Sequence, residues 1–586
     1  MSTEISLAAY LFKRLLQLGV GSIHGVPGDY NLELLDYVEP AGLHWVGNVN
    51  ELNSGYAADG YARIKGIGAI ITTFGVGELS AINAIAGAYV ERAPVVHIVG
   101  TPKRDIQDSR LLVHHTLNDG DYQHFSKMHT HVTVAQAVLR DPRTGPEEID
   151  HVLKQCLLQS RPVYIAIPVD LVAAKVSSAR LQTEIEIPKM LPTPELDNAL
   201  TKVLDRIYTA KQPMIFADGE CRALGIVNEV QALIKSTNWP TWTTPHGKGL
   251  WDEALPNFYG IYKGKYDDPA LKEFCDRADL ILFFGPHLSS TNTYEYSSTP
   301  KVGTGIYFTD TEIKIDNKVF RDIPARLAVA QLLQKLDLSR IQQPSTDYHK
   351  SIIGPYHRPL TFSDVSKDQY LTHDKLWRIL NNFLLPGDII LGETGTSGYG
   401  VRELLLPKGA RLFAPATWLS IGYMLPAAQG AALAQRELQQ QSQHHGDIGD
   451  GHQNSGRTIL FIGDGSFQMT VQELSTIIHN NLNVVVFLLN NDGYTIERCI
   501  HGLHERYNGV APWQYLHAPK FFGSGEDSFT ASVKNWGELE KALTDDRFTN
   551  SKGLRMIEIF LDREDVPEGP LSVFLQRERD RVKKVH

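Results

Sequence analysis

Two short polar turns near the C-terminal end of the chain carry side chains that could bind a metal ion. Gly463-Asp464-Gly465-Ser466 follows the apolar run 457–462, and Asn490-Asn491-Asp492-Gly493 follows the apolar run 484–489. If these runs are neighbouring parallel strands, both turns lie at the carboxyl edge of one sheet, where ligands bind. Carboxylate, amide and carbonyl oxygens suit Mg2+, and glycines let backbone amides approach a diphosphate. The spacing therefore favours a metal and diphosphate site over a plain strand-to-helix turn.

This pair of turns resembles the cofactor motif of the thiamine diphosphate-dependent 2-oxo acid decarboxylases, and the likeness extends from Leu7 to about Trp536. The pattern is closest to that of the fungal members. The resemblance implies that Asp464, Asn491 and the Gly493 carbonyl bind Mg2+. The residues that it implies for the rest of the cofactor's diphosphate end are Gly465, Ser466, Asn491, Gly493, Tyr494, Thr495 and Ile496. We therefore expect a lyase that uses thiamine diphosphate and Mg2+.

The segment Asn48-Val49-Asn50-Glu51-Leu52-Asn53 resembles the activating-glutamate segment of the same family, and the run 57–63 that follows it also matches. A carboxylic acid that donates to the aminopyrimidine ring favours the tautomer that removes the proton from the thiazolium carbon. Such a glutamate needs a poorly solvated site that tunes its pKa. The resemblance gives this role to Glu51, which by itself could equally be a surface or cap residue.

Asp29, His114, His115 and Glu497 look like the acid-base residues that distinguish decarboxylases within the family. After carbon dioxide leaves, the enamine on the cofactor must be protonated before the aldehyde is released. Carboxyl and imidazole groups near one substrate can share protons and hold unequal pKa values. Adjacent side chains of a regular strand point to opposite faces, so we expect an irregular backbone at His114-His115 or one histidine behind the other. We expect His115, with Asp29 and Glu497, to contact the substrate.

The segment 418–422 resembles the part of the family that bends the cofactor. By that resemblance the Leu419 carbonyl accepts from the aminopyrimidine amine, Ser420 lies beside it, and Ile421 wedges beneath the two rings. Yeast-type sequences have Gly at the position of Leu419, so the leucine side chain needs room there.

The segment 393–399 resembles the loop at the cofactor and substrate. Thr396 is expected to contact the cofactor and Thr394 to line the pocket. Gly398 replaces an Ala of yeast-type enzymes, which could widen the pocket, whereas Ile496 and Ile500 narrow it. We expect a small substrate, with pyruvate converted to acetaldehyde and carbon dioxide.

Apolar runs that alternate with helix-like segments predict three α/β units, each a doubly wound parallel sheet in the arrangement of this family. We predict an N-terminal pyrimidine-binding domain (1–185), a middle, regulatory-type domain (195–345) and a C-terminal diphosphate and magnesium domain (365–586). Polar sequence at 177–195 and 342–362 predicts linkers. The Gln-, His- and Gly-rich run 439–455 predicts a solvated loop insertion.

Composition limits the class of protein. The chain has 586 residues, of which 42% are hydrophobic and 21% charged, as in ordinary globular proteins. A formal net charge of −10 argues against a nucleic-acid-binding face, and no apolar run reaches the ~18 residues of a membrane span. Four scattered cysteines without a CxxC pair and no visible secretory signal predict a cytoplasmic protein.

Three other functions agree with parts of the sequence. One is another enzyme of the same cofactor, either an aromatic 2-oxo acid decarboxylase or an acetolactate synthase; the synthases usually need a flavin and lack the adjacent histidines. The second is a non-catalytic regulatory paralogue, but Glu51, His115 and Glu497 are all present. The third is a nucleotide-binding Rossmann protein, but no GxGxxG opens a first βαβ unit.

The cofactor residues are far apart in the chain. The resemblance implies that Glu51 and Asp464 meet across two subunits, in a homodimer or a dimer of dimers. It also links substrate activation in yeast-type enzymes to a middle-domain cysteine, and Cys221 stands at the matching place. Arg92 replaces the histidine that follows Glu91 in those enzymes, and an idle buried thiol is the alternative.

Overall fold

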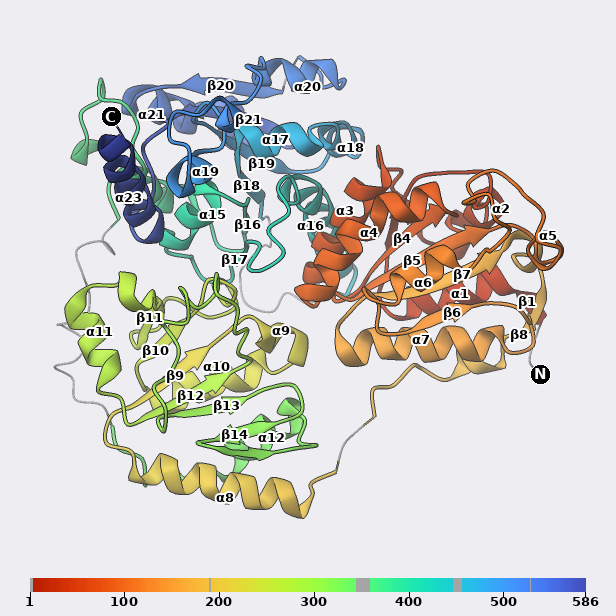
Figure 1. Cartoon of the computed structure of the whole chain (residues 1–586), viewed down its shortest axis with the longest axis horizontal. Coiled ribbons are helices and arrows are strands. Elements are labelled where there is room, and N and C mark those ends of the chain that lie inside the picture. Colours follow the sequence, from red (N-terminus) through yellow and green to blue (C-terminus); the bar gives the residue numbers. More distant parts are fainter. Residues whose placement is uncertain (1–3, 189–190, 344–358, 446–455, 527, 586) are drawn as a thin grey trace.

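Three large sheets follow one another along the described part of the chain, and helices cover their faces (Figure 1). Strands β1 (Glu4–Ser6) and β8 (Lys175–Ser177) form a separate antiparallel pair. The computed structural model describes residues 4–188, 191–343, 359–445, 456–526 and 528–585. The three helix-covered sheets confirm the predicted α/β class. Parts of the expected linkers 177–195 and 342–362 lie outside the described residues.

The first sheet has six strands in the order β3-β2-β4-β5-β7-β6, all paired in parallel. The strands are β2 (Ser22–Gly25), β3 (His44–Trp45), β4 (Gly68–Thr73), β5 (Val95–Thr101), β6 (Gln136–Val138) and β7 (Val163–Pro168). The main helices are α1 (Leu7–Gln17), α3 (Glu51–Lys65), α4 (Val76–Val90) and α7 (Gly145–Gln159), with shorter α2 (Leu32–Leu35), α5 (Arg104–Asp108) and α6 (His124–His129). Every residue of β4, β5 and β7 is buried, as continuous apolar runs predict for a sheet covered on both faces.

The second sheet is mixed, which differs from the parallel sheet predicted for the middle domain. Its order is β11-β10-β9-β12-β13-β14-β15, and β14 pairs antiparallel with both β13 and β15 because short turns join these three strands. The strands are β9 (Pro213–Ala217), β10 (Thr241–Thr243), β11 (Phe258–Ile261), β12 (Leu280–Phe284), β13 (Gly305–Phe308), β14 (Ile313–Ile315) and β15 (Lys318–Phe320). The helices include α8 (Pro194–Thr209), α9 (Glu220–Leu224), α10 (Val227–Thr237), α11 (Pro269–Asp276) and α12 (Ala325–Lys335).

The third sheet has six parallel strands in the order β17-β16-β18-β19-β21-β20. The strands are β16 (Ile389–Gly392), β17 (Arg411–Phe413), β18 (Thr458–Gly463), β19 (Val484–Asn490), β20 (Phe529–Val533) and β21 (Arg555–Phe560). Its helices include α14 (His373–Leu380), α15 (Thr396–Gly400), α16 (Met424–His445), α17 (Asp464–Thr470), α18 (Glu473–His479), α19 (Thr495–Ile500), α21 (Trp536–Thr544) and α23 (Pro570–Val585). The predicted loop 439–455 is wrong in its first part, which continues α16 to His445, and its remainder lies outside the described residues.

Helices α3 and α16 join the first and third domains of the same chain. A Cβ at Gly60 would lie 2.2 Å from the Ala427 carbonyl oxygen, and one at Gly430 would lie 1.9 Å from that of Ala57. Glycine is therefore required on both helices for their backbones to approach so closely. Buried side chains of both domains form one hydrophobic cluster around this crossing.

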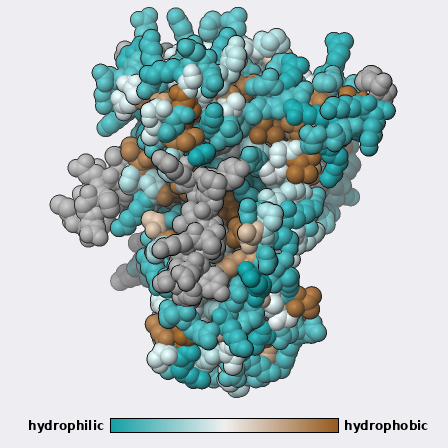
Figure 2. All heavy atoms as spheres, turned by 90° about the vertical axis from the view of Figure 1, so that its left-hand side faces the viewer, coloured by the Kyte–Doolittle hydropathy of each residue, from teal (hydrophilic) through white to brown (hydrophobic). Residues whose placement is uncertain are grey.

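The face of the molecule in Figure 2 is predominantly hydrophilic, and apolar residues occur there in small scattered groups. Within the part of the chain that the structure describes, no helix combines the length and the apolar character needed to cross a membrane.

A buried carboxyl group closes the N-terminal end of α4. Glu78 Oε1 accepts a hydrogen bond from the Gly75 amide at 2.9 Å, and Oε2 accepts one from the Tyr164 hydroxyl at 2.9 Å. Burial raises the pKa of Glu78 to about 7, although both hydrogen bonds oppose the rise. Ionisation of this group in the folded state therefore costs free energy near neutral pH.

Glu78→Gln should remove a pH-dependent part of the stability. The carboxyl ionises near pH 4.5 when unfolded and near pH 7 when folded, so its contribution to the free energy of unfolding is lost as pH rises through that window. Relative to the variant, the wild type should lose on the order of 3 kcal/mol across it. Urea unfolding at several pH values measures this, with the exposed Glu33→Gln as control. If the free energies of unfolding of the wild type and Glu78→Gln change in parallel with pH, the assignment of the raised pKa to Glu78 is contradicted.

Candidate active site

The two predicted metal-binding turns meet at one edge of the third sheet. Strands β18 and β19 pair with Gly463 opposite Leu489, so Asp464 and Asn491 follow neighbouring strand ends. Asp464 Oδ2 accepts from the Gly493 amide at 2.9 Å. One end of the Asn491 side-chain amide lies 3.1 Å from Asp464 Oδ1 and 2.9 Å from the Gly493 carbonyl oxygen. The amide nitrogen can donate to both atoms, and in the opposite orientation the amide oxygen faces both, as a metal ligand would. The structure thus brings the three expected metal ligands together.

Glycines shape this edge, and burial tunes its carboxylate. A Cβ at Gly465 would lie 2.5 Å from the Tyr494 ring, and Gly493 has a left-handed φ of 121°. Burial raises the pKa of Asp464 to about 6, and the amides of Gly493 and Gly465 oppose this rise. A divalent cation would favour the ionised form, so the set of oxygen atoms fits Mg2+.

The remaining residues expected around the diphosphate surround the same turns. Ser466 lies in the first turn of α17 and is buried, as is Thr495 at the start of α19. Tyr494 precedes Thr495 and is half-buried, and Ile496 follows it and is also half-buried. The Asn491 side chain also lies beside Thr396, at 3.4 Å from its hydroxyl. These positions suit a diphosphate held by turn and helix-start amides.

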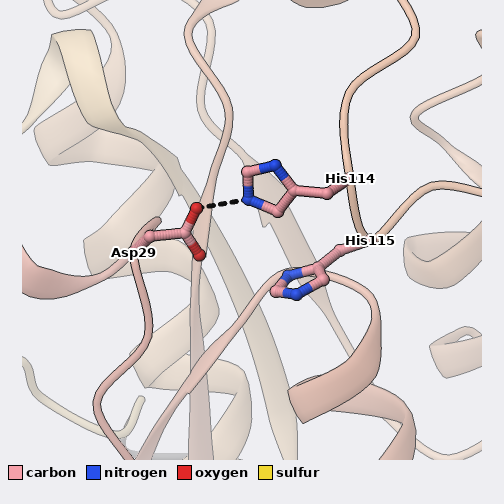
Figure 3. Close-up of side chains that lie close together, drawn as sticks. All are labelled: Asp29, His114 and His115. Atoms are coloured by element: carbon pink, nitrogen blue, oxygen red, sulfur yellow. Dashed lines mark hydrogen bonds and ion pairs between the residues drawn. The ribbon is translucent and has the colours of Figure 1, made fainter.

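Three of the four expected acid-base residues lie together in the first domain (Figure 3). His114 Nε2 is hydrogen bonded to Asp29 Oδ2, and a ligand atom of His115 lies within 4.8 Å of both. The His114 ring stacks on Tyr30, with centroids 5.0 Å apart and planes 14° apart. Asp29 follows β2, and the histidines follow α5, so two loops bring the three groups to one place.

The backbone at His115 is irregular, as the adjacent histidines predicted. His115 has a φ of 67°, in the left-handed region that bulky residues rarely adopt. A Cβ at Gly75 would lie 2.2 Å from the His115 carbonyl oxygen, so Gly75 allows the loop to pack closely on the start of α4. His115 Nδ1 is buried and, among the described residues, has no hydrogen-bond partner. A buried nitrogen of this kind can receive a bond from a ligand.

Glu51 begins helix α3, and Asn50 caps that helix by accepting from the Asn53 amide at 2.8 Å. The Glu51 side chain is half-buried and packs against Gly77, where a Cβ would lie 3.0 Å from Glu51 Oε1. Burial raises the pKa of Glu51. These are the properties that the role of a proton-donating carboxyl requires.

The segment 418–422 packs against helices α3 and α4 of the first domain. The Trp418 indole donates to Asn83 at 3.0 Å, and Ser420 Oγ lies 2.7 Å from the Tyr56 hydroxyl. Leu419 has a φ of 55°, where a side chain costs roughly 1–2 kcal/mol relative to glycine. Leu419 and Ile421 are both half-buried, so the leucine side chain finds partial space. A strained backbone that neighbouring bonds hold in place is typical of functional sites.

The loop after β16 carries Thr394 and Thr396. The Thr394 amide donates to Glu393 Oε1 at 2.7 Å, and the Thr394 hydroxyl is buried with no partner among the described residues. Burial raises the pKa of Glu393 to about 7. A Cβ at Gly398 would lie 2.7 Å from the Glu393 carbonyl oxygen. Gly398 thus packs closely on the Glu393 backbone, and its effect on the width of the pocket stays a prediction.

Glu497 lies apart from the other acid-base residues in one chain. It is exposed on α19, and among the described residues its side chain has no bond to Asp29, His114 or His115. Figure 1 shows α2 and α5, which flank those residues, on the opposite side of the molecule from α19. One chain therefore holds only part of the expected cluster.

The structure also describes residues that the sequence did not single out. Tyr30, which directly follows Asp29, packs against His114, and Glu78 anchors Gly75 beneath His115. The sequence signal that could have identified them is an aromatic or carboxyl residue close to each motif. Cys221 is fully buried, and burial raises the pKa of its thiol well above the usual range, so the thiol stays protonated and weakly reactive.

Comparison with known proteins agrees with this geometry. Models of the thiamine pyrophosphate enzyme family match the chain in its N-terminal TPP-binding domain (residues 5–127), central domain (200–336) and C-terminal TPP-binding domain (394–559). The chain is 56% identical to a pyruvate decarboxylase of Aspergillus parasiticus, over 96% of both chains. It is 40% identical to pyruvate decarboxylase isozyme 1 of Saccharomyces cerevisiae, over 97% of both.

A solved structure extends the likeness to the fold. The thiamine diphosphate-dependent 4-hydroxybenzoylformate decarboxylase of Rhodococcus jostii superimposes with a TM-score of 0.72, over 96% of this chain and 100% of that one, at 17% identity. The sequence identity of the two proteins is too low to indicate a shared substrate, but their three domains are arranged alike. With the family models and the near full-length relatives, these findings show that the chain belongs to the thiamine pyrophosphate enzyme family, among the pyruvate decarboxylases.

Proposed function

We propose that this protein decarboxylates pyruvate to acetaldehyde and carbon dioxide with thiamine diphosphate and Mg2+. The observation that carries the proposal is the convergence of Asp464, Asn491 and the Gly493 carbonyl on one sheet edge. Relatives at 40% and 56% identity, named as pyruvate decarboxylases, support the substrate. The Thr394 hydroxyl and the His115 Nδ1 are buried and have no hydrogen-bond partner in the described part of the chain, which supports a polar ligand at the site.

Each part of the cofactor has residues that would hold it. Asp464, Asn491 and the Gly493 carbonyl would bind Mg2+, and the amides of Gly465 and Ser466 would face the diphosphate. Thiamine diphosphate, when bound, would supply a nucleophilic carbon that adds to the 2-oxo carbon and an electron-poor ring that takes up the electron pair released by decarboxylation. Glu51 holds a proton against the aminopyrimidine ring, because burial keeps its carboxyl less acidic than usual. The Leu419 carbonyl, presented by a left-handed backbone, orients the amine of that ring.

Asp29, His114 and His115 supply the proton that the product aldehyde needs. The hydrogen bond between Asp29 and His114 lets this pair hold one proton between them. A ring nitrogen of His115 lies beside the Asp29–His114 pair, so His115 can bond the substrate while the pair supplies the proton. Glu497 completes the group from another chain and helps to exclude or position water at the reacting carbon.

The active assembly contains at least two copies of the chain, and we expect a dimer of dimers. Within one chain Glu497 lies far from the histidines, so a second copy must supply the Glu497 of each site. Large apolar side chains are exposed on the segments that carry the site, and a second copy would cover them. They are Val49 (42%), Val76 (53%), Leu111 (54%), Leu112 (59%) and Trp418 (42%).

We place the protein in the cytoplasm, with a small 2-oxo acid as its partner. The four cysteines are free and buried, which agrees with a reducing compartment. The net charge of −10 gives no support for a nucleic-acid partner.

Wild-type protein with pyruvate should release acetaldehyde and carbon dioxide only when both thiamine diphosphate and Mg2+ are present. Glu51→Gln should lower kcat about 10²–10⁴-fold, because an amide cannot shuttle the proton. A coupled alcohol dehydrogenase assay measures the aldehyde. The exposed middle-domain variant Glu195→Gln is the control and should keep full activity. Turnover by the wild type after complete cofactor removal would refute the proposal.

The half-buried Ile496 should restrict the substrate to a small side chain. We expect kcat/KM for pyruvate to exceed that for phenylpyruvate by at least about tenfold, and Ile496→Ala to narrow the ratio. Steady-state kinetics with both acids measure it. Equal or higher kcat/KM for the aromatic acid would favour the aromatic 2-oxo acid decarboxylase instead.

A further inference from the structure

A buried polar cluster lies where the first and third domains of one chain meet, close to the α3–α16 crossing. Its members come from the segment before α3, from α3 itself, from α16 and from α18. They are Asn48 (7% exposed), Asn53 (0%), Gln429 (0%), Glu473 (0%) and Thr476 (3%). Fully buried carboxyl and amide groups between domains are uncommon and need a reason.

The strongest contact of the cluster joins the two domains. Asn48 Nδ2 donates to Glu473 Oε1 at 2.7 Å, and it also lies 3.5 Å from Gln429 Oε1. Burial raises the pKa of Glu473, and the hydrogen bond from the Asn48 side chain opposes the rise. The groups that shift this pKa include neither Lys nor Arg among the described residues. The carboxyl therefore relies on the Asn48 amide as its donor.

Several neighbouring polar atoms make no bond with the protein. Glu473 Oε2, both side-chain atoms of Asn53, Gln429 Nε2 and Thr476 Oγ1 are buried without a hydrogen-bond partner among the described residues. Such groups cost free energy, so the cluster does not contribute to stability in the way that an apolar contact would. Its retention at this place points to a role in specifying geometry.

Asn48 connects the turn that leads to Asp29 with the segment that leads to Glu51. Its backbone amide donates to the Gly25 carbonyl at 2.9 Å, and its Oδ1 accepts from the Gly25 amide at 3.2 Å. Gly25 begins the turn that leads to Asp29. Asn48 itself leads, through the cap residue Asn50, to Glu51 at the start of α3.

The Glu473 carboxylate decides which way the Asn48 amide faces. An Asn side chain has an acceptor at one end and two donors at the other. Because the carboxylate accepts from Nδ2, Oδ1 must point to the Gly25 amide. Without Glu473 the amide could turn, and the bond that fixes Gly25 would be lost.

We propose that Glu473 is a positioning residue that fixes Asp29 and Glu51 through the side chain of Asn48. The inference rests on the proposed function for the roles of those two residues. It adds that helix α18, the second helix after the diphosphate turn, sets the geometry of the segments that lead to Asp29 and Glu51 in the first domain of the same chain. Since the active site combines two copies, this bond links the two sites to which one chain contributes.

The test compares five variants of the full-length protein. Glu473→Ala and Asn48→Ala should each raise the Kd of thiamine diphosphate, measured by calorimetry at saturating Mg2+, about tenfold, and the double variant should be no worse than either single one. Glu473→Gln keeps an acceptor for Asn48 and should stay within about twofold of the wild type. Thr476→Val, on the same helix and equally buried, is the matched control and should bind normally.

Hydrogen exchange separates positioning from a general loss of stability. In Glu473→Ala the peptides 22–31 and 44–56 should exchange faster, whereas α1 should not change. Wild-type affinity in both single variants, or additive losses in the double variant, would overturn the proposal. If the wild type binds the cofactor but forms no acetaldehyde, the proposed function fails. The Kd values of the variants still decide whether Asn48 and Glu473 are coupled. If Glu473→Ala does not fold, Asn48→Ala and Glu473→Gln give the same decision.

Discussion

The close crossing of α3 and α16 is the constraint on which the rest of the structure depends. Gly60 and Gly430 let two helix backbones touch, and any side chain at either position would collide with a carbonyl of the other helix. The Tyr423 hydroxyl donates to Asp59 at 2.8 Å, and Lys65 pairs with Glu437 at 3.0 Å along the same contact. The first and third domains of one chain therefore hold a fixed relation, and so do the two half-sites that they carry.

Strained backbone occurs at the positions where the half-sites present their reactive groups. His115 and Leu419 both adopt left-handed conformations, and Gly75 and Tyr56 lie against the segments that hold them there. The cost of each is on the order of 1–2 kcal/mol, which local packing must supply. Flexible loops would avoid that cost but would not hold an imidazole or a carbonyl in one orientation, as catalysis requires.

Local sequence patterns predicted the strands, because buried parallel strands are continuous apolar runs, and the metal turns, because they follow such runs directly. For the adjacent histidines the sequence left two alternatives, an irregular backbone or one histidine behind the other, and the φ of His115 shows an irregular backbone. The hairpin β14–β15 and the helical continuation to His445 were missed, since antiparallel pairing and polar helices have weak periodic signals. The contact between Asn48 and Glu473 depends on packing between segments that are distant in the sequence, so no local signal could show it.

The central claim is that one thiamine diphosphate is held by Glu51 of one chain and by Asp464 of a second. Mixing inactive Glu51→Gln and Asp464→Asn proteins under conditions of subunit exchange tests it most directly. A hybrid dimer would contain one site with both substitutions and one intact site, so random exchange should restore about one quarter of wild-type acetaldehyde formation. Hybrids that form, as shown by tagged capture, but remain inactive would contradict the claim.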